Sequence, residues 1–192
     1  MQALTKLTTG SKNIAVGAAS LDANTTGSNN VAVGNEAMTT NTTGDDNTAI
    51  GTGALALATT ASNNTAVGKD ALVANTTGIQ NNAFGSGALD ANTTGNYNVA
   101  MGYVALGANT TASANVAIGY ASLFDNTTGA NNTAVGYNAL LANTTGTQNV
   151  AIGSLALDAN TTANANTALG YQALTANTTG ANNTAVGKDC ME

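Results

Sequence analysis

The sequence predicts an all-β fold, a parallel β-solenoid (β-roll) of about eleven coils with 17 residues each. An apolar residue followed by glycine recurs every 17 residues from Gly17 to Gly187, without insertion or deletion. Only nine residues separate the two glycine-rich positions of each repeat, which is too short for a stable isolated helix. Short segments such as Asn-Thr-Ala-Val, bounded by turn-forming residues, are instead typical of strands joined by tight turns.

We number the repeat from its invariant asparagine, so that residues 132–148 (NTAVGYNALLANTTGTQ) form one copy. Position 1 is always Asn, position 3 is always Ala, position 4 is always apolar and position 5 is always Gly. Position 9 is Leu or Met, and positions 13 and 14 are both Thr. We expect each of these positions to form a column along the rod, with stacked coils about 4.8 Å apart. In this copy the structural ladder comprises Asn132, Ala134, Val135, Gly136, Leu140, Thr144 and Thr145.

The strand at positions 1–4 begins each coil. Side chains alternate along a strand, so positions 2 and 4 share one face and positions 1 and 3 share the other. We expect the apolar position 4 to face the coil interior. Because position 3 is restricted to Ala, the opposite face is predicted to pack against another chain in a homotrimer. The alternative is that Ala at position 3 lies in a narrow interior and that position 4 faces a second layer.

The turns and polar columns follow the strand. Gly at position 5, such as Gly136, is predicted to turn the chain with a positive φ. The Asn column at position 1 is expected to form an amide ladder along the axis. Asn at position 12 is expected to turn the chain, because Asn tolerates the left-handed region. Neighbouring Thr residues point to opposite faces, so one Thr of each pair should pack inward and one should form a hydroxyl ladder.

Composition excludes several functional classes. The net charge is −6 with four Lys and no Arg, which argues against a nucleic-acid partner. The sequence holds no apolar run of membrane-spanning length, so we expect no membrane insertion in this segment. His is absent, and no acid pair or phosphate-binding loop recurs, so we expect no enzymatic activity, no cofactor and no metal site. The single cysteine, Cys190, occupies an Ala position and is interpreted as a core residue.

An aromatic cluster is the candidate recognition patch. Tyr103, Tyr120 and Tyr137 occupy position 6 in three successive coils, and Phe124 lies between them in the sequence. A stripe of this kind can contact sugars or a protein partner, such as a host-surface glycan or protein. The alternative is that the rings stack on one another and shield a turn.

The repeats resemble those of known surface fibres. Residues 115–119 and 149–153 (both NVAIG) are similar to the head repeats of trimeric autotransporter adhesins. Residues 132–137 (NTAVGY) and 143–146 (NTTG) look like repeats of phage tail fibres and related bacterial surface fibres. The resemblance implies a homotrimer of parallel β-solenoids that is extracellular, on a cell surface or a virion. The 17-residue coil is longer than that of the usual adhesin head.

Together these features predict a single repeat array over residues 1–192 that begins and ends inside a repeat, as a segment of a longer fibre would. The expected function is that of a structural fibre segment, acting as a rigid spacer or a receptor-binding head. One alternative is a monomeric solenoid that binds ice or another surface through Thr and Asn columns. A second alternative is a subunit that assembles end to end into an extracellular filament.

Overall fold

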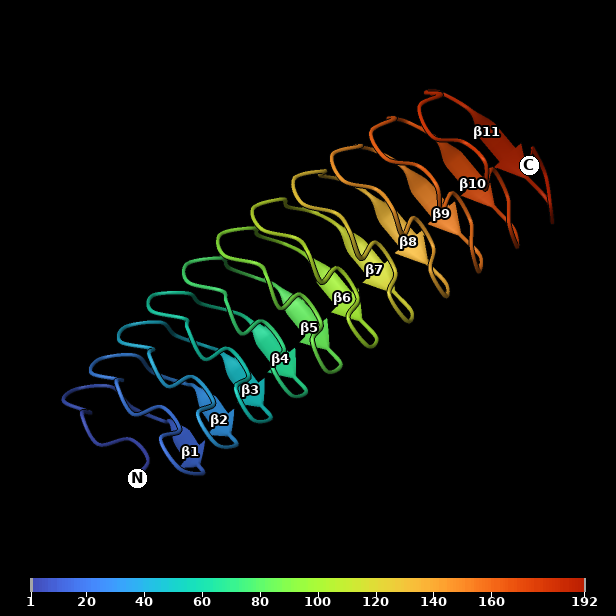
Figure 1. The fold of residues 1–192 in the computed structure, drawn as a ribbon. Helices are drawn as coiled ribbons and strands as arrows, with labels where there is room; N and C mark the ends of the chain where they lie inside the picture. The colour runs from blue at the N-terminus through green and yellow to red at the C-terminus, as the bar shows by residue number, and fades with distance from the viewer. Residues whose placement is uncertain (1, 192) are drawn as a thin grey trace.

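The computed structural model describes residues 2–191 as a parallel β-solenoid in which each repeat forms one coil (Figure 1). The coils stack into a rod with the two chain termini at opposite ends. The strands are β1 (Ile14–Val16), β2 (Val31–Val33), β3 (Thr48–Ile50), β4 (Thr65–Val67), β5 (Asn82–Phe84), β6 (Val99–Met101), β7 (Val116–Ile118), β8 (Thr133–Val135), β9 (Val150–Ile152), β10 (Thr167–Leu169) and β11 (Thr184–Val186). The described residues contain no helix that is long and apolar enough to cross a membrane.

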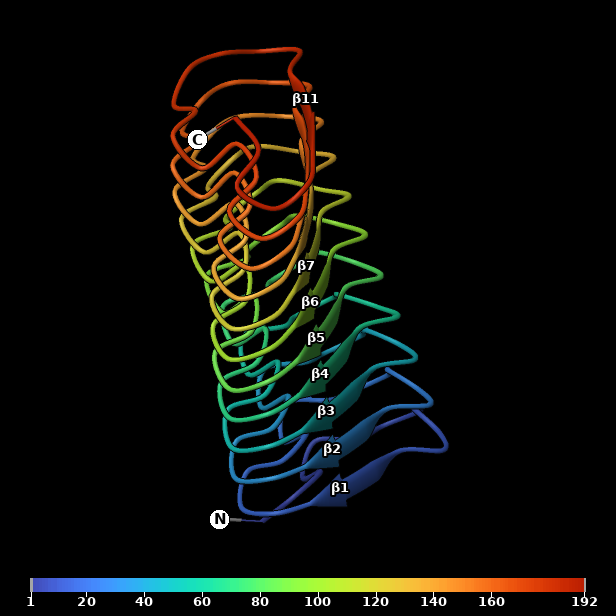
Figure 2. The ribbon, with the colours of Figure 1, turned by 90° about the vertical axis from the view of Figure 1, so that its right-hand side faces the viewer.

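The strands form one sheet whose order follows the chain, from β1 to β11. Each strand pairs in parallel with the next, and equivalent positions of the repeat face each other, as Ala134 faces Ala151. The N–H of Thr133 donates to the carbonyl of Asn149 at 2.8 Å, and the N–H of Gly136 donates to that of Ile118 at 2.8 Å. Figure 2 shows the strands stacked along one side of the rod. The constant repeat length keeps every one of these bonds in register, since one additional residue would shift a whole coil against its neighbours.

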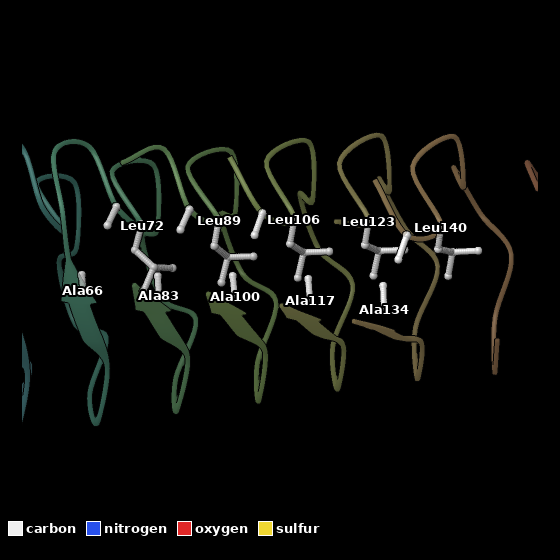
Figure 3. Close-up of a cluster of buried hydrophobic side chains, with 14 of the residues drawn as sticks. Ala66, Leu72, Ala83, Leu89, Ala100, Leu106, Ala117, Leu123, Ala134 and Leu140 are labelled. Carbon is white, nitrogen blue, oxygen red and sulfur yellow. The ribbon is translucent and has the colours of Figure 1, made fainter. Parts of the chain in front are cut away.

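The apolar core consists of columns of small and medium side chains inside the coils, at positions 3, 8 and 9 of the repeat. Ala at position 3 lies on the strand side and Leu at position 9 lies on the opposite wall, and both are fully buried in the central coils. The leucine side chains, such as Leu106 and Leu123, point toward the strand alanines (Figure 3). The interior is therefore one layer of side chains thick.

The orientation expected for position 4 is wrong. Ala134 at position 3 has no exposed surface, whereas Ile118 at position 4 is 37% exposed and Val135 is half-buried. The reason is steric, because only a methyl group fits between the strand and the leucine wall. The larger side chains of the strand consequently point outward. Ala lies in a narrow interior, as the alternative predicted, but position 4 faces outward and not toward a second layer. The expected packing of position 3 against another chain is wrong, because this position is enclosed.

The turns use the left-handed region at several positions. Gly136 has φ 139°, which confirms the predicted positive φ, and a Cβ there would lie 2.5 Å from the carbonyl oxygen of Gly153. Asn at position 12 does not turn the chain in this way. The left-handed residues lie instead at positions 7, 9 and 17, as in Asn138 (φ 52°), Leu140 (φ 53°) and Asn131 (φ 60°).

Replacing glycine at position 5 is expected to destabilise the rod much more than replacing it at position 15. Gly136→Ala places a Cβ against backbone and adopts a disfavoured φ, so it should cost at least about 2 kcal/mol, and Gly136→Val should cost more. Gly146→Ala is the matched control. A Cβ there would lie 2.4 Å from the carbonyl oxygen of Ala163, as close to backbone as at Gly136, but Gly146 does not have a positive φ, and Ala61, Ala112 and Ala163 occupy the same position of the repeat. Thermal unfolding followed by circular dichroism measures both variants. Equal melting temperatures would contradict the assignment of position 5 as an obligatory glycine turn.

Candidate functional site

The interior carries a ladder of buried asparagines at position 1. The side chain of Asn132 is fully buried. Its Oδ1 accepts a bond from the backbone N–H of Asn149 in the next coil at 2.9 Å, and its Nδ2 donates to the carbonyl of Gly146 at 2.8 Å. Each position-1 amide therefore joins two coils and also closes its own coil, so this column has a structural role.

A second buried ladder runs along position 12. Nδ2 of Asn143 donates to Oδ1 of Asn126 in the preceding coil at 2.8 Å and to the carbonyl of Gly146 at 3.1 Å. The carbonyl at position 15 thus receives a donor from both asparagine columns. A buried amide costs free energy unless it is hydrogen-bonded. The carbonyl at position 15 supplies an acceptor to the buried amide of both columns.

The position-12 ladder is interrupted at one coil. Ala58 replaces the asparagine there, and Oδ1 of Asn41 in the preceding coil is buried without a hydrogen-bond partner. On the other side of the gap, Nδ2 of Asn75 is bonded to the carbonyl of Gly78 at 3.0 Å within its own coil. The coil of residues 47–63 is therefore a point of incomplete hydrogen bonding in the rod.

The threonine pair divides its two side chains between different environments. Thr144 at position 13 is half-buried, and its Oγ1 donates to the carbonyl of Thr161 in the next coil at 3.1 Å. Thr145 at position 14 is exposed. Position 14 thus forms one file of exposed threonines along the rod. Both asparagine columns are buried in the central coils, so their side chains are not part of an exposed array there.

The outer face of the sheet carries an apolar column at position 4, beside a column at position 2 that mixes Val or Ile with Thr and Asn. We call it the outer sheet face and define it by the side chains at positions 2 and 4 of all coils. Its exposed large apolar residues at position 4 are 37–63% exposed, namely Val16, Ile50, Phe84, Met101, Ile118, Ile152, Leu169 and Val186. Sequence reasoning missed this face, although one signal pointed to it. Position 4 accepts side chains of different size and shape, as an outward column can, whereas the enclosed position 3 accepts only Ala.

The tyrosine row at position 6 follows directly after the glycine turn. The rings of Tyr103 and Tyr120 stack with their centroids 5.5 Å apart and an interplanar angle of 19°. The rings of Tyr120 and Tyr137 stack at 5.3 Å and 15°. All three residues are at least half exposed. The rings therefore cover each other's faces and present their edges to solvent.

Phe124 lies in a different column of the repeat. It occupies position 10 and is half-buried, and a Cβ added at Gly107 in the preceding coil would lie 2.9 Å from its ring. Its ring thus covers the glycine below it. The structure brings the three tyrosines together by stacking, whereas Phe124 packs within its own column.

The side chains of Asp90 and Lys69 have shifted pKa values. Burial raises the pKa of the Asp90 carboxyl, and the charge of Asp70 adds to this shift. The pKa of the Lys69 amine is raised chiefly by its hydrogen bond with Asp70. Cys190 is a half-buried free thiol. Within residues 2–191, no group of three or more His, Cys, Asp or Glu side chains could hold a metal ion.

Comparisons with protein-family models, with curated proteins and with solved structures give no match to this chain. Its functional interpretation therefore depends on the geometry of the rod.

Restoring the interrupted ladder is expected to stabilise the protein. Ala58→Asn supplies the missing donor to Asn41 and should raise the free energy of unfolding by about 1–2 kcal/mol. The position accepts Asn beside the Ala at position 15, since Asn109 and Ala112 combine in this way in another coil. The measurement is the melting temperature, with hydrogen exchange of the neighbouring coils as a local probe.

Two further variants control this test. Ala142→Asn adds the same side chain at position 11, outside both ladders, and should not stabilise. Asn126→Ala opens a second gap and should destabilise the rod. A melting temperature of Ala58→Asn at or below that of the wild type would contradict the proposed role of the ladder.

Proposed function

We propose that this protein is a structural fibre segment, a rigid rod that associates with copies of itself through the outer sheet face. The observation that carries the proposal is the continuous apolar column at position 4, exposed or half-buried in every coil, along a rod of constant repeat. The largest apolar patch on a typical monomer covers about 300–600 Å² and often marks an interaction surface. Eleven strands, each about 10 Å long and spaced by about 4.8 Å, give a face of about 500 Å².

A copy of the same chain is the partner that fits this face over its full length. The side chains of the outer sheet face repeat with every coil, and only a partner with the same axial spacing places a side chain between each pair of them. A globular partner matches this spacing over a few coils at most.

The proposed number of chains in the assembly and the proposed extracellular location are based on the resemblance to known fibres. Autotransporter heads and phage fibres suggest a homotrimer that is extracellular, on a cell surface or a virion. Three rods related by a threefold axis can direct their outer sheet faces toward the axis and shield them from water. In such a fibre the rod acts as a spacer or as a receptor-binding head, with a host-surface glycan or protein as the outside partner. The proposal involves no enzymatic step, nucleic acid or membrane insertion.

The test is the assembly state of the purified protein. We expect sedimentation velocity and native mass spectrometry to give three times the chain mass of 18.7 kDa. The variant Ile118→Thr, Val135→Thr, Ile152→Thr changes three successive coils of the outer sheet face. It should dissociate to a monomer that keeps its β-sheet circular dichroism, because position 4 does not contribute to the interior.

The matched control is the variant Thr111→Ser, Thr128→Ser, Thr145→Ser in the exposed threonine file of the same region. It should assemble like the wild type. A wild-type monomer at micromolar concentration would overturn the self-association. Assembly of the outer-face variant at wild-type strength would show that a different surface carries it.

A further inference from the structure

The order of residues along position 6 leaves a gap in the tyrosine row. From coil to coil the row reads Lys69, Ser86, Tyr103, Tyr120, Tyr137, Ser154, Tyr171 and Lys188. The three central rings stack on one another, as described above. Tyr171 is separated from this stack by the single coil that carries Ser154.

The face of the Tyr171 ring is directed along the rod axis. The Nζ atom of Lys188, one coil further on, lies 5.8 Å from the centroid of this ring. The opposite ring face therefore points back toward the coil of Ser154. The Tyr137 ring, stacked on Tyr120 from the other side, directs its free face toward the same coil. The ring faces of Tyr137 and Tyr171 are thus opposed across the coil of Ser154, and both tyrosines are about half exposed.

The width of this gap defines what can occupy it. Two coils separate the rings, so their planes lie about 10 Å apart. Subtracting one carbon–carbon contact of about 3.5 Å leaves about 6.5 Å of free space between the ring faces. A flat ring is too thin to touch both faces. A rounded group such as trimethylammonium touches both, with its centre about 5 Å from each centroid, which is within the range of cation–π contacts.

The electrostatics of the gap favour a cation. Aromatic faces carry negative quadrupole density, so they attract positive charge. On the far face of Tyr171 the chain already places a cation, Lys188, whose charge is compensated by Asp189 at 3.2 Å. The net charge of −6 attracts cations to the rod as a whole.

We propose that the gap above Ser154, between the rings of Tyr137 and Tyr171, is a binding site for an alkylated ammonium group of the trimethylammonium class. This site goes beyond the fibre function and does not require self-association, because one chain supplies both rings. The group occurs on choline headgroups of lipids, on free choline and on trimethylated lysine. The gap above Ser86 serves as an internal comparison. It is bounded by Lys69 and Tyr103, so it offers one ring face and a positive charge, and it should not take a cation.

The experiment titrates the protein with choline and, in parallel, with its neutral isostere 3,3-dimethylbutan-1-ol, which has the same shape without the charge. NMR of the tyrosine ring protons is the readout. Choline should shift Tyr137 and Tyr171 saturably, and Tyr120, which has a ring on each side, should not shift. Ser154→Tyr fills the gap with a residue that position 6 already accepts in four coils, and it should weaken choline binding at least tenfold.

The outcomes are distinct. Equal shifts with the neutral isostere, or no saturable shift at Tyr137 and Tyr171, would overturn the site. Unchanged choline binding by a folded Ser154→Tyr variant would also overturn it. Phosphatidylcholine vesicles and a trimethyllysine peptide then present the group on a membrane and on a protein. Displacement of choline by either carrier supports the site and identifies the carrier, whereas saturable choline binding with no competition from either carrier supports a site for the free small molecule.

Discussion

The rod depends on one constraint, the exact superposition of each coil on the next. The backbone bonds between coils, the inter-coil bonds of the two asparagine ladders and the threonine hydroxyl bonds all connect residues at equivalent or neighbouring positions of the repeat. Each of these bonds is modest in net free energy, but a buried amide left without a partner is costly. A change in the length of one coil would break all of them at once for that coil. The polar interior therefore enforces the repeat length more strictly than apolar packing would, because apolar contacts tolerate small shifts.

The narrow interior determines the outside. With Leu on one wall and Ala on the other, the coil has no room for the larger strand residues. Position 4 must then place Val, Ile, Met or Phe in contact with solvent along the full length of the rod. A coil with so thin a core gains limited stability from its own apolar burial, and stacking along the axis supplies the remainder. Self-association through the outer sheet face would bury additional apolar surface perpendicular to the rod axis, where the thin core of a single coil buries little.

Sequence reasoning predicted the fold class, the coil length, the position of the strand and the glycine turn at Gly136. These follow from periodicity and from backbone chemistry, which are local. It failed on the direction of position 4, because alternation along a strand tells which residues share a face but not which face is enclosed. It also failed on Asn at position 12, since the residue type suits both a turn and a ladder. The left-handed Leu140 had no signal in the sequence, because Leu is rarely found at positive φ. Only the packing of the whole coil holds it there.

A rod built from near-identical coils offers the same surface at every step, so any discrete recognition must arise where a column changes. The tyrosine row illustrates how little change is required. Had Ser154 been a tyrosine, the rings from Tyr103 to Tyr171 would form one closed stack with no free faces between them. A single small residue instead leaves two ring faces opposed at twice the coil spacing. In a solenoid the backbone sets distances in multiples of one coil, so the omission of one side chain creates a gap of defined width without any change in the fold. The regularity that makes the rod a suitable spacer is therefore also what would fix the geometry of a site within it.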